Sequence, residues 1–155
     1  MRAQFDHEKL DVYRIELQFV EWSTDLLSGI EPRKGVRIGE ICDQLDRASL
    51  SALLNTAEGN GKRRRQQRAK FFDDARGSVT ECAACLDALV AKKVASNDEI
   101  EEGKVLLVRA YSMLTKLVSI FDESGLLKED EGEYRVGDDV ALGTERLSGI
   151  EDGNE

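Results

Sequence analysis

The chain has 155 residues, the size of a single domain, and it is long enough to bury a sizeable core. Charged residues make up 34% and hydrophobic residues 41%, with a single proline, which is typical of a charged, mostly helical protein. No apolar run approaches the roughly 18 residues of a membrane span. The first residues also lack the apolar segment of a signal peptide, so we expect a cytoplasmic protein.

The net charge of −9 is spread unevenly along the chain. Residues 128–155 hold ten acidic and three basic residues, a net charge of −7, which leaves only −2 for the rest. We therefore expect two parts: a folded domain over residues 1–127 and an acidic, disordered tail over residues 128–155. Local pairing of the fragment 133–136 within this tail is not expected. The negative net charge of the whole chain does not by itself exclude a nucleic-acid ligand, because the tail supplies most of that negative charge.

Apolar residues at helical spacing predict four helices, over residues 7–27, 38–58, from the basic run near residue 62 to 93, and 97–124. Asp6 is the expected N-cap of the first helix, and Ser96 with Glu99 forms a capping box before the fourth. Gly59 is expected to end the second helix in a left-handed conformation, with Asn60 and Gly61 as the turn. Short connections make neighbouring helices antiparallel, so the predicted fold is an all-α, up-down-up-down four-helix bundle.

The first helix is apolar on more than one side. The expected core stripe is Leu10, Tyr13, Leu17, Val20 and Leu27, and a second set is Val12, Ile15, Phe19, Trp22 and Leu26. A helix with two apolar sides suggests that one of them is buried against another subunit. The expected core positions of the other helices are Ile38, Ile41, Leu45, Ala48, Ala52, Phe72, Ala75, Val79, Cys82, Leu86, Leu89, Ile100, Gly103, Leu107, Ala110, Leu114, Leu117 and Phe121.

A dense basic run joins the second and third helices. Six positive charges fall within nine residues, at Lys62, Arg63, Arg64, Arg65, Arg68 and Lys70. Basic side chains at the start of a helix are suited to phosphate contact, which makes these six the candidate nucleic-acid-binding residues. The alternative is a solvated corner or a patch of ion pairs between subunits. Phe71 and Phe72 lie beside the run, but Phe72 belongs to the expected core, so no base-stacking platform is predicted.

Four polar residues lie next to the expected core: Arg47, Asn55, Glu58 and Glu81. They could meet near the corner between the second and third helices. We interpret them as a structural network that fixes the register of the helices rather than as a catalytic carboxylate pair.

The remaining motifs do not indicate an enzyme. Cys82 and Cys85 form a C-x-x-C in the middle of a helix, where small core residues are a better interpretation than redox chemistry. A zinc site needs four ligands, and the chain adds only Cys42 and His7. No nucleophile–histidine pairing, di-iron motif or phosphate-binding loop is present in the sequence. We therefore predict a non-enzyme without a metal or cofactor.

Four segments together resemble one bacterial family of four-helix bundle proteins. They are FDHEKLDVYRIELQFVEW (5–22), LDRAS (45–49), NTAEGNGKR (55–63) and KFFDDARGSVTE (70–81). The family includes proteins encoded in intervening sequences of 23S ribosomal RNA genes. The accessory variability determinant of diversity-generating retroelements is a related member. A proline that the family often carries before the asparagine of the turn is absent here, where Leu53 and Leu54 stand, and the acidic tail lies outside the shared pattern.

The resemblance implies a homo-oligomeric ring, typically a pentamer, without known catalytic activity. The retroelement members look like basic partners of a reverse transcriptase that also contact nucleic acid. RNA or DNA, a reverse transcriptase and further copies of the chain are therefore the expected partners. The alternative function is a protein–protein interaction scaffold with no nucleic-acid role, in which the basic run forms ion pairs between subunits.

Overall fold

The structure is a computed structural model, and it describes residues 2–127. The predictions of a disordered acidic tail and of no local pairing at residues 133–136 concern residues outside this range.

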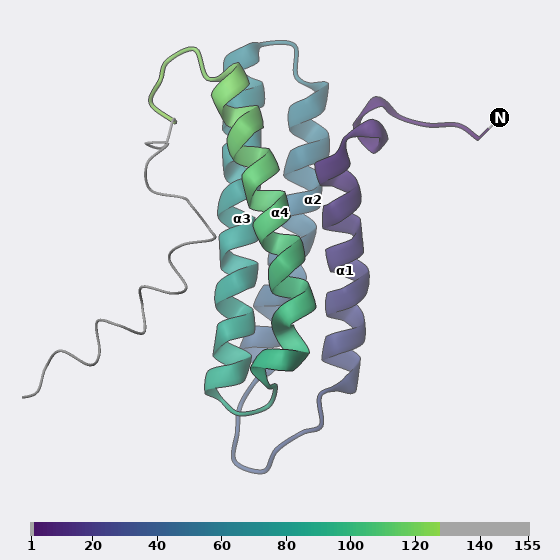
Figure 1. Cartoon of the computed structure of the whole chain (residues 1–155), viewed down its shortest axis with the longest axis vertical. Coiled ribbons are helices and arrows are strands. Elements are labelled where there is room, and N and C mark those ends of the chain that lie inside the picture. The colour runs from purple at the N-terminus through teal and green to yellow at the C-terminus, as the bar shows by residue number, and fades with distance from the viewer. Residues whose placement is uncertain (1, 128–155) are drawn as a thin grey trace, which may run out of the picture.

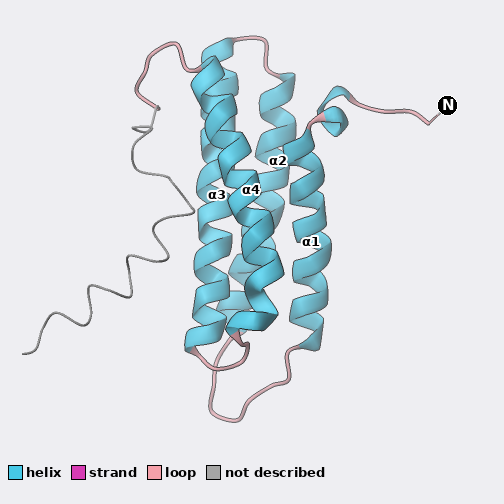
Figure 2. Cartoon of the chain, viewed as in Figure 1, coloured by secondary structure: helices cyan, strands magenta, loops and turns pink. Residues whose placement is uncertain are grey.

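Four long helices form an antiparallel bundle (Figure 1). They are α1 (Asp11–Gly29), α2 (Gly39–Gly61), α3 (Arg65–Ala91) and α4 (Asn97–Phe121), and a short 3-10 helix, η1 (Asp6–Lys9), precedes them. Each helix packs against its two neighbours, and α1 closes the bundle by packing against both α2 and α4. No strand occurs in the described residues (Figure 2), so the predicted all-α fold is confirmed.

The core combines large aliphatic and aromatic side chains with several small ones. The most deeply buried large side chains include Leu45, Phe72, Leu86, Leu89 and Leu114. Alanines at positions 48, 52, 69, 75 and 110 let the helix backbones approach one another. Most of the core positions expected on α2, α3 and α4 are buried, which confirms the helical spacing as their signal.

On α1 the second apolar set lies deeper in the core than the stripe that we expected there, although Leu10 and Leu27 of that stripe also pack against the core. Val12, Ile15 and Phe19 are buried in the core, whereas Leu17 is 39% exposed. The prediction that Leu17 lies on the core stripe was therefore wrong. Both stripes have the same spacing, so the spacing could not choose between them. What decides is α4, whose Gly103 lies against the ring of Trp22 and makes room for the second stripe.

Two predicted helix ends differ from the structure. Asp6 lies inside η1 and does not cap α1, whose N-cap is Leu10, because the Asp6 carboxylate instead accepts a hydrogen bond from Asn60 (3.0 Å). Helix α4 ends at Phe121, before the predicted residue 124. The capping box before α4 is confirmed: Ser96 Oγ accepts from the Glu99 N–H (3.1 Å), and the Glu99 carboxylate accepts from the Ser96 N–H (3.2 Å).

No helix in residues 2–127 is both long enough and apolar enough to span a membrane.

Candidate nucleic-acid interface

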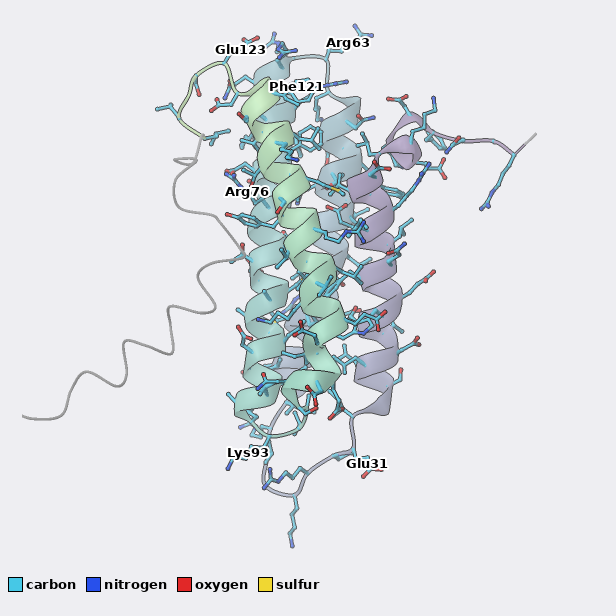
Figure 3. All side chains as sticks on the ribbon, viewed as in Figure 1. Glu31, Arg63, Arg76, Lys93, Phe121 and Glu123 are labelled. Carbon is cyan, nitrogen blue, oxygen red and sulfur yellow. The ribbon has the colours of Figure 1, made fainter. Side chains whose placement is uncertain are left out.

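The basic run occupies one end of the bundle. Arg63 lies at the tip between α2 and α3, and Phe121 and Glu123 lie at the same end, whereas Glu31 and Lys93 lie at the opposite end (Figure 3). The turn consists of Lys62, Arg63 and Arg64, and α3 begins at Arg65 without a side-chain cap. We call this end, from Gly59 to Lys70, the basic corner.

Gly59 serves close packing and not the left-handed helix end that we predicted. It lies within α2, which continues through Asn60 to Gly61. Positive φ angles among the described glycines occur at Gly35 and Gly125. A Cβ atom on Gly59 would lie 2.9 Å from the Phe71 Cβ and 3.2 Å from the Phe72 ring. The glycine is therefore needed because the first turns of α3 pass directly over it.

Arg68 closes the basic corner from the α3 side. Its Nε donates to the Lys62 carbonyl (2.7 Å) and its Nη2 donates to the Asn60 carbonyl (2.8 Å). These carbonyls belong to the end of α2, where backbone acceptors lack helical partners. The guanidinium also lies over the Phe121 ring, 5.2 Å from its centroid. The Arg68 side chain therefore stabilises the contact between the end of α2 and the first turns of α3.

Arg65 and Gln66 tie the start of α3 to the end of α4. Arg65 donates to the Ile120 carbonyl (2.6 Å) and forms an ion pair with Glu123 (3.3 Å). Gln66 Nε2 donates to Asp122 (3.0 Å), whose carboxylate also accepts from the Ser124 hydroxyl (2.7 Å). Hydrogen bonds, first that from Ser124, lower the pKa of Asp122 to about 2. Asp122 is therefore ionised at neutral pH and holds the end of α4 in place.

The six candidate cations thus divide into two groups. Lys62 forms an ion pair with Glu58 (3.2 Å) and lies 4.9 Å from the centroid of the Phe71 ring, so it joins Arg65 and Arg68 in holding the corner together. The side chains of Arg63, Arg64 and Lys70 are exposed, and they have no hydrogen-bond or ion-pair partner within residues 2–127. We call these three residues the free cations. They carry uncompensated positive charge at the end of the bundle.

The four polar residues that we placed next to the core do not meet at the corner. Glu81 accepts from Gln44 (2.7 Å), which in turn accepts from Arg47 (3.1 Å). Asn55 instead donates to Ser51 (3.1 Å), and Ser51 shares a hydrogen bond with Ser78 of α3 (2.9 Å). Within residues 2–127, Glu58 pairs only with Lys62. Two separate polar links, through Gln44 and through Ser51, therefore join α2 to α3.

The three cysteines are free thiols. Cys82 and Cys85 are buried on α3, and burial, followed by the neighbouring Cys85, raises the pKa of the Cys82 thiol to about 12. Burial also raises the pKa of Cys85 and of Cys42. Thiols with raised pKa values are poor nucleophiles and poor metal ligands at neutral pH. In the described part of the chain, no group of three or more His, Cys, Asp or Glu side chains is arranged to hold a metal ion.

One buried ionisable residue was not predicted from the sequence. Glu16 of α1 lies in the core, where its Oε1 accepts a hydrogen bond from the Thr56 hydroxyl of α2 (2.6 Å). Its Oε2 is buried without a partner among the described residues. Desolvation raises the pKa of Glu16 to about 8. The available signal was its place in the sequence, between the buried Val12, Ile15 and Phe19.

The four antiparallel helices place the protein in the class of small four-helix bundle proteins. Residues 8–116, more than half of the chain, match the family described as 23S rRNA-intervening sequence protein. The chain belongs to this family, and the resemblance noted from the sequence is confirmed. A search of curated proteins finds no match to the chain.

Proposed function

We propose that this protein is a non-catalytic, homo-oligomeric bundle that binds RNA or DNA through its basic corner. The observation that carries the proposal is the set of three free cations. Arg63, Arg64 and Lys70 stay exposed while their neighbours Lys62, Arg65 and Arg68 are held by protein groups. Charges held in this way give the corner a fixed shape, and the free cations remain available for phosphates.

The first turn of α3 adds to this electrostatic preference. Its backbone N–H groups point toward the loop that carries Arg63 and Arg64, and α3 has no side-chain cap. The positive end of the helix dipole therefore acts in the same direction as the free cations. Several copies of the corner in one assembly would bind a long nucleic acid more tightly than one copy can.

An exposed apolar surface supports self-association. Leu50 and Leu54 on the outer side of α2 are 43% and 61% exposed, and Leu17 lies on the outer side of the neighbouring α1. The hydrogen bond between Glu16 and Thr56 joins the two helices one residue away from Leu17 and two residues away from Leu54. We call Leu17, Leu50 and Leu54 the α1–α2 patch. A pentameric ring, as the family resemblance implies, would bury this patch, and an accessory role beside a reverse transcriptase would use the corner.

The test is the salt dependence of nucleic-acid binding. We expect the full-length protein to bind RNA or DNA with a slope of log affinity against log salt of roughly −2 to −3 per corner, because three phosphates are neutralised. Replacing Arg63, Arg64 and Lys70 together by glutamine should remove most of this slope. A control variant with Lys34, Arg109 and Lys116 replaced by glutamine loses the same charge from exposed sites elsewhere.

Two results would count against the proposal. Equal binding by the two triple variants would show that total charge matters and the corner does not. If the corner variant instead dissociates the assembly in light scattering, the basic run forms ion pairs between subunits, which is the scaffold function.

A further inference from the structure

Three aromatic side chains among residues 5–13 pack against one another at the end of the bundle that carries the basic corner. The Phe5 ring lies 5.8 Å from the His7 ring with an interplanar angle of 21°. His7 in turn meets the Tyr13 ring edge-on at 4.8 Å. Phe5 forms the outer end of this stack and is 74% exposed. We call Phe5, His7 and Tyr13 the aromatic stack.

Polar contacts hold the aromatic stack close to the end of α2. Asp6, between Phe5 and His7, accepts a hydrogen bond from Asn60 (3.0 Å). Asn60 lies in the last turn of α2, directly before the turn that carries Arg63 and Arg64. The carbonyl of the same Asn60 accepts from Arg68. Hydrogen bonds from Asn60 and Lys9 lower the pKa of Asp6, and Arg68 contributes to the same shift. The segment that carries Phe5 is therefore fixed to the residues that shape the corner.

Hydrogen bonds link this segment to itself and to α1, although its outer ring is exposed. The backbone N–H of Phe5 donates to the Glu8 carboxylate, and the Glu8 carbonyl accepts from Arg14 Nε of α1 (3.3 Å). The bundle core does not require Phe5, because most of its ring faces solvent. An exposed aromatic face at the same end of the bundle as uncompensated cations is the combination by which proteins bind unpaired bases and their backbone together.

The acidic groups of the segment are largely compensated within it. Asp6 pairs with Lys9 (3.4 Å), and Asp11 lies 3.9 Å from Arg14. The Glu8 carboxylate accepts the Phe5 N–H. Two of the three acidic side chains near Phe5 are therefore paired within the segment, and Arg63 and Arg64 add uncompensated positive charge at the same end of the bundle.

We propose that the aromatic stack and the free cations form one binding site for single-stranded nucleic acid, in which an unpaired base stacks on Phe5. The phosphates that follow this base would lie along Arg63 and Arg64. This inference rests on the proposed function and narrows it to one class of ligand. Bases within a duplex already stack on each other and cannot cover Phe5, so the aromatic contribution is specific to single strands.

The test compares single strands with the matching duplex, using labelled RNA and DNA oligonucleotides of about 12 nucleotides. Replacing Phe5 by alanine in the full-length protein should weaken single-strand binding by at least about 5-fold, since stacking of one base contributes that much. Phe5→Leu keeps an apolar side chain without an aromatic face and should bind as weakly as Phe5→Ala. Phe5→Tyr should bind like the wild type. Duplex affinity should be the same in all four proteins.

A fluorescent variant provides a direct readout of stacking. The chain has a single tryptophan, Trp22, which is half-buried on α1. Phe5→Trp adds an exposed indole whose emission should be quenched when a single strand is added, and the duplex should leave it unchanged. Val105→Ala, which trims an exposed side chain of α4, serves as a control for non-specific surface effects.

The results separate this inference from the proposed function. Salt-dependent single-strand binding that is the same in wild type, Phe5→Ala and Phe5→Leu would overturn the aromatic site and leave the basic corner intact. An equal loss of single-strand and duplex affinity in Phe5→Ala would also overturn it, because stacking would not be the cause. If the wild type binds neither RNA nor DNA at low salt, the proposed function fails, and this inference fails with it.

Discussion

Glu16 shows how a single buried side chain makes the stability of the bundle depend on pH. Its carboxyl group bridges α1 and α2 through Thr56, and the second oxygen has no partner in the described structure. Burial without a counter-ion favours the neutral acid, which is why the pKa rises from an ordinary 4.5 to about 8. The raised pKa therefore favours the protonated form of Glu16 at neutral pH.

The sign of the pH dependence follows from this raised pKa. Between pH 4.5 and about 8 the folded protein keeps a proton on Glu16 that the unfolded chain has released, so the contribution of Glu16 to stability falls as pH rises. The loss is complete above about pH 8 and amounts to several kcal/mol, on the order of 5 kcal/mol. Glu16→Gln should remove this dependence, because the amide stays neutral.

Urea denaturation at about pH 5, 7 and 9 measures the effect as a difference between variant and wild type, which cancels the contribution of other carboxylates. Glu16→Gln should gain stability relative to wild type as pH increases. The exposed Glu21→Gln on the same helix should follow the wild type at every pH. Parallel profiles for Glu16→Gln and wild type would contradict a buried, protonated Glu16.

At the scale of the helices, the contact between α1 and α4 depends on one glycine. Gly103 of α4 is buried beneath the Trp22 ring, and a Cβ at this position would overlap that ring. Gly77 of α3 is the matched case, since a Cβ there would meet nothing within 4 Å. One glycine is therefore required by packing, whereas the other only lowers the helix propensity of α3.

Substituting alanine for each of these two glycines should change the stability of the bundle in opposite directions. Gly103→Ala should destabilise the bundle by about 1–3 kcal/mol, because Trp22 must move out of a packed site. Gly77→Ala should stabilise it by about 0.5–1 kcal/mol. Chemical denaturation measures both, and the emission of Trp22, the only tryptophan, should change in Gly103→Ala alone. Stabilisation by both substitutions would show that the ring does not need the glycine.

Sequence patterns predicted the helices better than their ends and faces. Spacing located all four helices, and the Ser96–Glu99 capping box was confirmed because its partners are local. Asp6 failed as a cap because its partner, Asn60, is distant in sequence. The buried side of α1 was likewise decided by Gly103 on another helix. What the sequence left open depended on contacts between distant segments.

The candidate site shows the same division at the scale of the whole molecule. The density of positive charge located the basic corner. It did not show that Arg65 and Arg68 are held by carbonyls at the ends of α4 and α2, which leaves Arg63, Arg64 and Lys70 free. It also did not show that Phe5 and His7 lie near the corner, since only the Asp6–Asn60 contact brings them there. How the six cations function in binding stays a prediction for the salt titration.

Assembly is the property of the whole molecule that the exposed α1–α2 patch predicts. Leu54 is 61% exposed, and Leu50 and Leu17 extend the patch. If this patch is the interface between copies, Leu54→Glu places a charge against an apolar surface and should weaken each contact by roughly 10- to 100-fold, from the burial energy of one large aliphatic side chain. Val105→Glu on the outer side of α4, where the side chain is 49% exposed, is the matched control.

Light scattering of the full-length proteins across concentration distinguishes the outcomes. Leu54→Glu should shift the mass toward that of a single chain, and Val105→Glu should leave the assembly intact. Dissociation by Val105→Glu alone would show that the interface lies on α4.

The same variants also test nucleic-acid binding, because an assembly that presents several basic corners gains affinity from their number. Leu54→Glu should therefore weaken binding to a long single strand while leaving binding to a strand that spans one corner unchanged, since Leu54 lies outside the corner itself.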